Sequence, residues 1–110
     1  VGRETLTSRA GVRTATADRA PLCGLAPDAA AFNAIHAAHP SDNATVPAHD
    51  GLYMLGGLGS RGFTLAPLLG EAIAAEICGE PQVLDRGALE AANPARYLLR
   101  ALKRGRPLPT

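Results

Sequence analysis

A glycine-rich turn limits what this chain can fold into more than any other feature. Five of the twelve glycines fall within residues 51–62, and three of them follow the pattern Gly57-x-Gly59-x-x-Gly62. The apolar run 51–55 before the pattern predicts a short buried strand, and a helical run follows it. A turn of this kind brings backbone N–H groups and the positive end of a helix close to a ligand.

The same spacing occurs in the dinucleotide-binding turn of Rossmann folds, which also needs a second parallel strand that ends in an acidic residue. After the helix this chain has only the short run Glu80-Pro81-Gln82-Val83-Leu84, and proline is rare in central strands. A pyrophosphate site is therefore disfavoured. A strand-to-helix turn without any ligand stays open as the alternative.

Local signals elsewhere predict a few strands and several helices. The expected strands are 9–16, 22–25 and 51–55, the expected helices are 29–38, 64–78 and 94–104, a turn covers 17–20, a short helical turn covers 85–92, and 44–50 is a loop. The predicted N-caps are Asp28, Thr64, Asp85 and Asn93, and the predicted C-terminal stops are Gly79 and Gly105.

Two helices carry further expectations. In helix 29–38, Phe32 and Ile35 lie on the expected apolar stripe. In helix 64–78, Pro67 is expected in the first turn, where its missing N–H costs nothing. Small residues recur every fourth position along that helix, at Ala66, Gly70 and Ala74, so we expect this ridge to lie close to a sheet.

Composition leaves little material for a core. Of 110 residues, 22 are alanine and only 24 are Leu, Ile, Val or Phe, which is close to the composition at which burial stops offsetting chain entropy. No run of about 18 apolar residues exists, so we expect no membrane span. We therefore expect an α+β fragment of a larger cytoplasmic protein, which agrees with a first residue, Val1, that is not Met.

Metal and thiol chemistry are both disfavoured. Cys23 and Cys78 are too few for a disulfide scaffold or a zinc site of the CxxC type, and both are expected to be unreactive buried thiols. The histidines at 36, 39 and 49, with Asp50, lie in a loop-like region without a convincing fourth ligand. Solvated histidines are the better interpretation, and no metal is expected.

Two motifs can be compared with known families. The first is Gly11-Val12-Arg13-x-x-Thr16-x-Asp18-x-x-Pro21-Leu22-x-Gly24, and the second is Gly51-Leu52-Tyr53 leading into Gly57-Leu58-Gly59-Ser60-Arg61-Gly62-x-x-x-Ala66-Pro67. With them the chain resembles the C-terminal third of the D-amino-acid oxidase and glycine oxidase family of flavoproteins. The runs Gly79-Glu80-Pro81 and Asn93-Pro94-Ala95-Arg96 make it similar, more narrowly, to the FAD-dependent module of bifunctional tRNA-modifying enzymes, over residues 11–105.

This resemblance implies FAD as cofactor and tRNA as substrate. The implied reaction oxidises the carboxymethylaminomethyl group of the wobble uridine to aminomethyl and releases glyoxylate. S-adenosylmethionine would belong to a separate methyltransferase module, which is missing here, as is the N-terminal FAD fingerprint. The 110 residues are therefore expected to be the C-terminal segment of the oxidoreductase domain and inactive alone. A free amino-acid or amine oxidase and a non-catalytic RNA-binding module are the alternatives.

The resemblance also assigns roles to residues. Arg13 would pair with the substrate carboxylate, because a guanidinium binds a carboxylate through two parallel hydrogen bonds. Ser60 or Arg61 would supply a second substrate contact. The residues expected at the flavin ring are Leu58, Gly59, Ser60, Arg61, Gly62, Phe63 and Thr64. Asp18 either positions Arg13 or, as we favour, caps a turn.

The C-terminal helix has a basic face. Arg96, Arg100 and Arg104 are four residues apart, and Lys103 lies beside them. If tRNA is the substrate, these four residues would contact its phosphates, with an affinity that falls as salt rises. A simply solvated face is the alternative.

Overall fold

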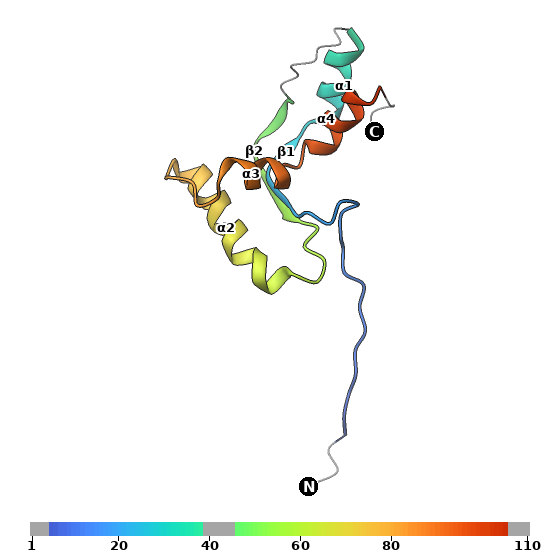
Figure 1. The fold of residues 1–110 in the computed structure, drawn as a ribbon, viewed down its shortest axis with the longest axis vertical. Helices are drawn as coiled ribbons and strands as arrows, with labels where there is room; N and C mark the ends of the chain where they lie inside the picture. Colours follow the sequence, from blue (N-terminus) through green and yellow to red (C-terminus); the bar gives the residue numbers. More distant parts are fainter. Residues whose placement is uncertain (1–4, 39–45, 106–110) are drawn as a thin grey trace.

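The computed structural model of the protein describes residues 5–38 and 46–105 and shows a small α+β arrangement (Figure 1). The elements are β1 Leu22–Pro27, α1 Ala29–Ala38, β2 Ala48–Gly56, α2 Gly62–Cys78, α3 Arg86–Ala92 and α4 Arg96–Lys103. The expected mixture of few strands and several helices is therefore confirmed. None of the described helices is long and apolar enough to cross a membrane.

The two strands form an antiparallel sheet with α1 in their connection. Leu22 lies opposite Gly56 and Leu25 lies opposite Tyr53, and the register shifts before Pro27. The predicted loop 44–50 is wrong over its last three residues, since β2 begins at Ala48. The strand predicted at 51–55 exists, but it is longer and largely exposed rather than buried. Only two strands are paired in the described chain, so one edge of β2 has no strand beside it there.

Helix α1 begins as predicted at an aspartate. The Ala31 N–H donates to Asp28 Oδ1 at 3.0 Å, which confirms Asp28 as N-cap. Phe32 is fully buried, whereas Ile35 is half-exposed, so only the first of the two predicted stripe residues is in the core.

The strand predicted at 9–16 is wrong. Ala15 alone makes an isolated bridge, to Leu58, and the preceding described residues belong to no strand. Val12 is fully exposed. In Figure 1 this N-terminal stretch, drawn in blue, runs away from the rest of the molecule. Alternation of side chains determines which face of a strand each residue would occupy, but a strand also needs a neighbouring strand. Within the described chain no backbone pairs with residues 5–13.

Helix α2 starts earlier than predicted. It begins at Gly62 after Arg61, which provides no side-chain cap, so Thr64 is inside the first turn and its assignment as N-cap is wrong. Pro67 lies beyond the first turn, where its ring leaves the Phe63 carbonyl without the usual helical donor. The predicted end is confirmed, because Gly79 adopts a left-handed conformation with φ of 67° and its N–H bonds the last turn.

The face of α2 that packs is also different from the expected one. Leu69, Ala72 and Ala75 are buried, and the first two join Cys23 and Ala92 in the main core cluster. A Cβ placed on Gly70 would meet nothing within 4 Å. Gly70, in the middle of the ridge of small residues, therefore faces open space, and the buried face of α2 instead runs through Leu69, Ala72 and Ala75.

The two C-terminal helices follow their predicted signals closely. Asp85 Oδ1 accepts the Ala88 N–H at 2.7 Å and caps α3. Asn93 Oδ1 accepts the Ala95 N–H at 2.9 Å, so Asn93 caps a turn that precedes α4 rather than the helix itself. The helix therefore begins at Arg96 instead of 94, and Gly105, with φ of 61°, follows its end.

Candidate functional site

The two motifs singled out in the sequence lie against each other. The Gly59 N–H donates to the Thr14 carbonyl at 2.9 Å, and Ala15 bridges Leu58. Residues 13–16 therefore run beside the glycine turn 57–61, although Arg13 and Gly59 are 46 positions apart in the chain.

Glycine is required at the closest point of this contact. Gly57 has φ of 63°, a left-handed conformation that other residues rarely adopt. A Cβ at this position would lie 2.7 Å from Thr16 Cγ2. Gly59 is left-handed as well, with φ of 58°, and its added Cβ would contact Ala15 at 3.6 Å. The turn can approach residues 14–16 this closely because its glycines have no side chains.

Arg13 reaches this turn with most of its guanidinium exposed. Its Nη1 lies 3.5 Å from the Gly59 carbonyl oxygen, a long hydrogen bond. The remaining N–H groups of Arg13 have no partner among the described residues. The guanidinium is therefore beside the glycine turn and has donors available for a carboxylate.

The N-terminus of α2 is open. Phe63 is 97% exposed and Thr64 is exposed as well, and no side chain caps the helix. The Leu65 N–H makes the first helical bond, to Arg61 at 2.9 Å. The backbone N–H groups of the first turn therefore stay available at the positive end of the helix dipole.

Arg61 is engaged elsewhere in the structure. Its Nη2 donates to the Arg19 carbonyl at 2.8 Å and so ties the glycine turn to the turn 17–20. Ser60 is exposed at the tip of the glycine turn. Of the two candidates for a second substrate contact, Ser60 is thus the one whose side chain has no other partner in the described chain.

An ion pair that the sequence did not reveal anchors the turn 17–20. Arg96 Nε donates to Asp18 Oδ2 and Arg96 Nη2 donates to Asp18 Oδ1, both at 2.8 Å. Arg100 Nη1 donates to Asp18 Oδ2 at 2.7 Å, and the Tyr97 hydroxyl donates to Oδ1 at 2.9 Å. Asp18 also accepts the Ala20 N–H at 3.0 Å, which confirms the predicted turn-capping role.

Both members of the pair have perturbed ionisation. Hydrogen bonds from Arg96 hold the pKa of Asp18 far below its usual range, against the opposing effect of desolvation, and Arg100, the Ala20 N–H and Tyr97 add to the lowering. The hydrogen bond to Asp18 in turn raises the pKa of Arg96. The pair is therefore fully charged at any ordinary pH.

This arrangement overturns one predicted phosphate contact. Arg96 is 5% exposed, and its remaining N–H groups donate to the carbonyls of Ala20, Pro21 and Asn93, so it cannot reach a phosphate. The spacing of four residues placed Arg96 on the same helix face as Arg100 and Arg104. The prediction failed because the start of α4, where Arg96 lies, packs against the body of the molecule. Arg100 is about half-exposed, and Lys103 and Arg104 are exposed.

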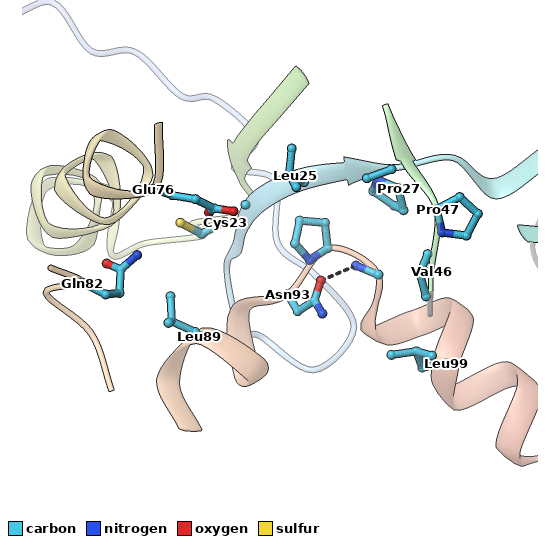
Figure 2. Close-up of a pocket in the computed structure, with 14 residues that line it drawn as sticks. Cys23, Leu25, Pro27, Val46, Pro47, Glu76, Gln82, Leu89, Asn93 and Leu99 are labelled. Atoms are coloured by element: carbon cyan, nitrogen blue, oxygen red, sulfur yellow. Dashed lines mark hydrogen bonds between the residues drawn. The ribbon is translucent and has the colours of Figure 1, made fainter. Parts of the chain in front are cut away.

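A separate cavity of about 480 Å³ lies between β1 and the chain that leads into α4 (Figure 2). Its polar lining comes from Glu76, Gln82 and Asn93, and none of the predicted site residues borders it. Cys23 lies at one end, where its Sγ approaches the Leu69 carbonyl at 3.5 Å. Burial, followed by the charge of Glu76, raises the pKa of Cys23, so this thiol is a poor nucleophile.

No metal cluster is formed by the part of the chain that the structure describes. His39 and the side chain of His36 lie outside that part.

Comparison with known proteins gives two findings. The sequence model of the family described as FAD dependent oxidoreductase matches residues 2–76. The chain is 46% identical over 104 residues to the tRNA 5-methylaminomethyl-2-thiouridine biosynthesis bifunctional protein MnmC of Aeromonas hydrophila. It is 43% identical over 109 residues to the protein of the same name from Shewanella putrefaciens. Each alignment covers 92% of this chain but 16% of the relative. These matches confirm the family resemblance drawn from the motifs.

Proposed function

Because the chain belongs to the FAD-dependent oxidoreductase family, we propose that it supplies the substrate anchor and part of the flavin site of a tRNA-modifying flavoprotein. The relatives are named as bifunctional proteins of tRNA 5-methylaminomethyl-2-thiouridine biosynthesis. The proposed reaction converts the carboxymethylaminomethyl group of a wobble uridine to aminomethyl and releases glyoxylate. The observation that carries the proposal is the juxtaposition of the Arg13 guanidinium with the glycine turn before α2.

The residues at that turn fit one edge of a flavin ring. Their donors are backbone N–H groups at an uncapped helix start, and the left-handed glycines leave no side chain over the turn. Donors of this kind, with the helix dipole, suit the electron-rich side of the ring, which becomes negative on reduction. The residues proposed to hold it are Leu58, Gly59, Ser60, Gly62, Phe63 and Thr64, while Arg61 ties the turn to the Arg19 carbonyl.

Bound FAD would supply a two-electron acceptor for the hydride removed from the carbon between carboxylate and amine, and water would then hydrolyse the substrate imine to aminomethyl and glyoxylate. Arg13 would bind the substrate carboxylate through paired N–H groups and so orient the carbon between carboxylate and amine. The tip of α2 would favour negative charge nearby without any reorganisation, because its N–H groups are fixed by the helix. Ser60, exposed at the same turn, would offer a hydroxyl to the substrate or ring.

The remaining parts of the proposed reaction would need protein outside these 110 residues, which span 16% of the length of the relatives. We propose that the adenosine and pyrophosphate of FAD are held by the rest of the oxidoreductase domain, and that S-adenosylmethionine serves a separate methyltransferase module. The chain alone should then be inactive and should not retain flavin at unit stoichiometry after purification. Retention of yellow flavin by the isolated 110 residues would contradict this division.

Arg13→Ala in the intact flavoprotein is the test of the proposed anchor. Loss of a charge-assisted hydrogen bond should weaken substrate binding by about 10- to 100-fold while the flavin stays bound. Arg13→Lys keeps the charge but loses the paired geometry, so it should recover only part of the loss. Unchanged substrate binding in Arg13→Ala would refute the anchor.

A free amino-acid or amine oxidase is the second candidate, because an exposed guanidinium would bind the carboxylate of a free amino acid equally well. The two functions differ in substrate. Release of glyoxylate from tRNA that carries the modified uridine supports the first, and turnover of free glycine or sarcosine instead supports the second.

Contact with tRNA phosphates is proposed for Arg100, Lys103 and Arg104, the members of the basic face that remain exposed. Charge reversal of Lys103 and Arg104 should weaken tRNA binding and reduce its salt dependence, because each phosphate contact releases counterions. If the protein were only an RNA-binding module, these changes would abolish binding and Arg13→Ala would have no effect on any reaction.

A further inference from the structure

We propose that the Asp18–Arg96 pair is a positioning device that sets where Arg13 stands relative to the tip of α2. Neither residue is at the glycine turn, and both act through the turn 17–20 that lies between. The inference rests on the proposed function, since it concerns the same substrate anchor. It assigns to the C-terminal helix α4 a role in the geometry of the site.

Arg96 holds the turn from one side. All five N–H groups of its guanidinium are bonded, two to the carboxylate of Asp18 and the others to the carbonyls of Ala20, Pro21 and Asn93. The guanidinium is planar and rigid, so these partners are fixed relative to one another as well as to α4. Its stacking on the Tyr97 ring, 4.7 Å from the ring centroid, fixes the plane further.

The glycine turn holds the same segment from the other side. Arg61 Nη2 bonds the Arg19 carbonyl at 2.8 Å, and the Gly59 N–H bonds the Thr14 carbonyl at 2.9 Å. Thr16 links the two ends: its hydroxyl donates within the turn to the Ala20 carbonyl at 2.6 Å, and its methyl group occupies the space that a Cβ on Gly57 would need.

Residues 14–20 are thus clamped between α4 and the glycine turn. Arg13 precedes this clamped segment directly, and the residues before it belong to no strand in the described chain. The position of Arg13 therefore depends on the clamp rather than on a strand of its own. A change at Asp18 should reach Arg13 and residues 57–61, although Asp18 contacts neither.

The test uses the intact flavoprotein with Asp18→Asn, which keeps the side-chain shape but removes the charge. Amide hydrogen exchange should become faster in residues 13–21 and 57–61. In the second half of α2 the exchange rates should stay unchanged. KM for the carboxylate substrate should rise about tenfold, because Arg13 is misplaced. The fold-change in kcat should be smaller than the fold-change in KM. Tyr97→Phe removes the two hydrogen bonds between the Tyr97 hydroxyl and Asp18 but keeps the ion pair, so it should produce a smaller change in the same segments.

Asp85→Ala is the control, because Asp85 caps α3 and the substitution removes that cap, which has no link to the glycine turn. It should speed exchange in 86–92 and leave KM unchanged. Faster exchange at 57–61 in this control would show a general loss of stability and would overturn the positioning role.

A double-mutant cycle separates this inference from the proposed function. If Asp18 acts through Arg13, the effects of Asp18→Asn and Arg13→Ala on KM are less than additive. If Arg13→Ala weakens binding but Asp18→Asn changes neither KM nor exchange at 57–61, the positioning role is wrong and the anchor stands. If Arg13→Ala has no effect on KM, the anchor is wrong and so is any positioning of it. Fully additive effects would also overturn the inference.

Discussion

Replacing Gly57 by alanine should disrupt the contact on which the candidate site depends. The left-handed conformation, with φ of 63°, costs a non-glycine residue about 1–2 kcal/mol. The new Cβ would also lie 2.7 Å from Thr16 Cγ2, well inside van der Waals contact. Relieving that overlap by shifting neighbours costs about 1–3 kcal/mol more, so the expected destabilisation is about 2–5 kcal/mol.

Two other glycines separate these contributions. Gly79 is left-handed, with φ of 67°, but a Cβ there meets nothing within 4 Å. Gly79→Ala should therefore show only the backbone cost of about 1–2 kcal/mol. Gly70 is helical and also open, so Gly70→Ala should stabilise α2 by about 1 kcal/mol through helix propensity.

The steric part can be removed in a second step. Thr16→Ser deletes the methyl group but keeps the hydroxyl that bonds Ala20. In the Gly57→Ala background it should recover most of the steric cost and leave the backbone cost. Urea unfolding of the intact protein, followed by flavin fluorescence, measures each free energy of unfolding. Equal losses in Gly57→Ala and Gly79→Ala, or no recovery with Thr16→Ser, would refute the argued packing against the glycine turn.

Three further outcomes follow from the structure. Asp85→Ala should cost about 1 kcal/mol by removing the N-cap of α3, measured by the same urea titration. Asp18→Asn should be less stable than the parent at neutral pH. Because the folded-state pKa of Asp18 is lowered, its stabilisation is complete above the unfolded-state pKa of about 3.9 and declines as pH falls below it. The stability difference between Asp18→Asn and the parent should therefore narrow only below about pH 4; a difference that narrows as pH rises would have the wrong sign. A thiol reagent should modify Cys78, which is exposed, much faster than Cys23, which is buried and has a raised pKa; equal rates by mass spectrometry would contradict that assignment.

Local sequence signals were sufficient where the physics is local. Asp28, Asp85 and Gly79 were identified as helix ends because each acts on backbone groups within a few residues of itself. The glycine turn was placed between strand and helix for the same reason. Thr64 failed as a cap because Arg61 ends the preceding turn, with its N–H bonded to the Leu58 carbonyl, and the helix starts before Thr64 is reached.

Contacts between distant residues were not readable in this way. Asp18 and Arg96 are 78 positions apart, and a basic residue repeated every fourth position looks like a solvated face. The strand expected at 9–16 failed for a related reason, since alternation describes one segment while pairing depends on a second one.

The hairpin of β1 and β2 has a wider consequence. Within residues 5–38 and 46–105 each strand bonds only the other, so each turns one row of amide and carbonyl groups outward. Any extended backbone that arrives in register can continue the ladder at those rows. When that backbone comes from the same protein, the hairpin becomes the rim of a larger sheet; when it comes from another copy, the ladder grows between molecules and the chain precipitates. Which backbone pairs first with the free edges of β1 and β2 therefore decides whether a folded domain or an aggregate forms.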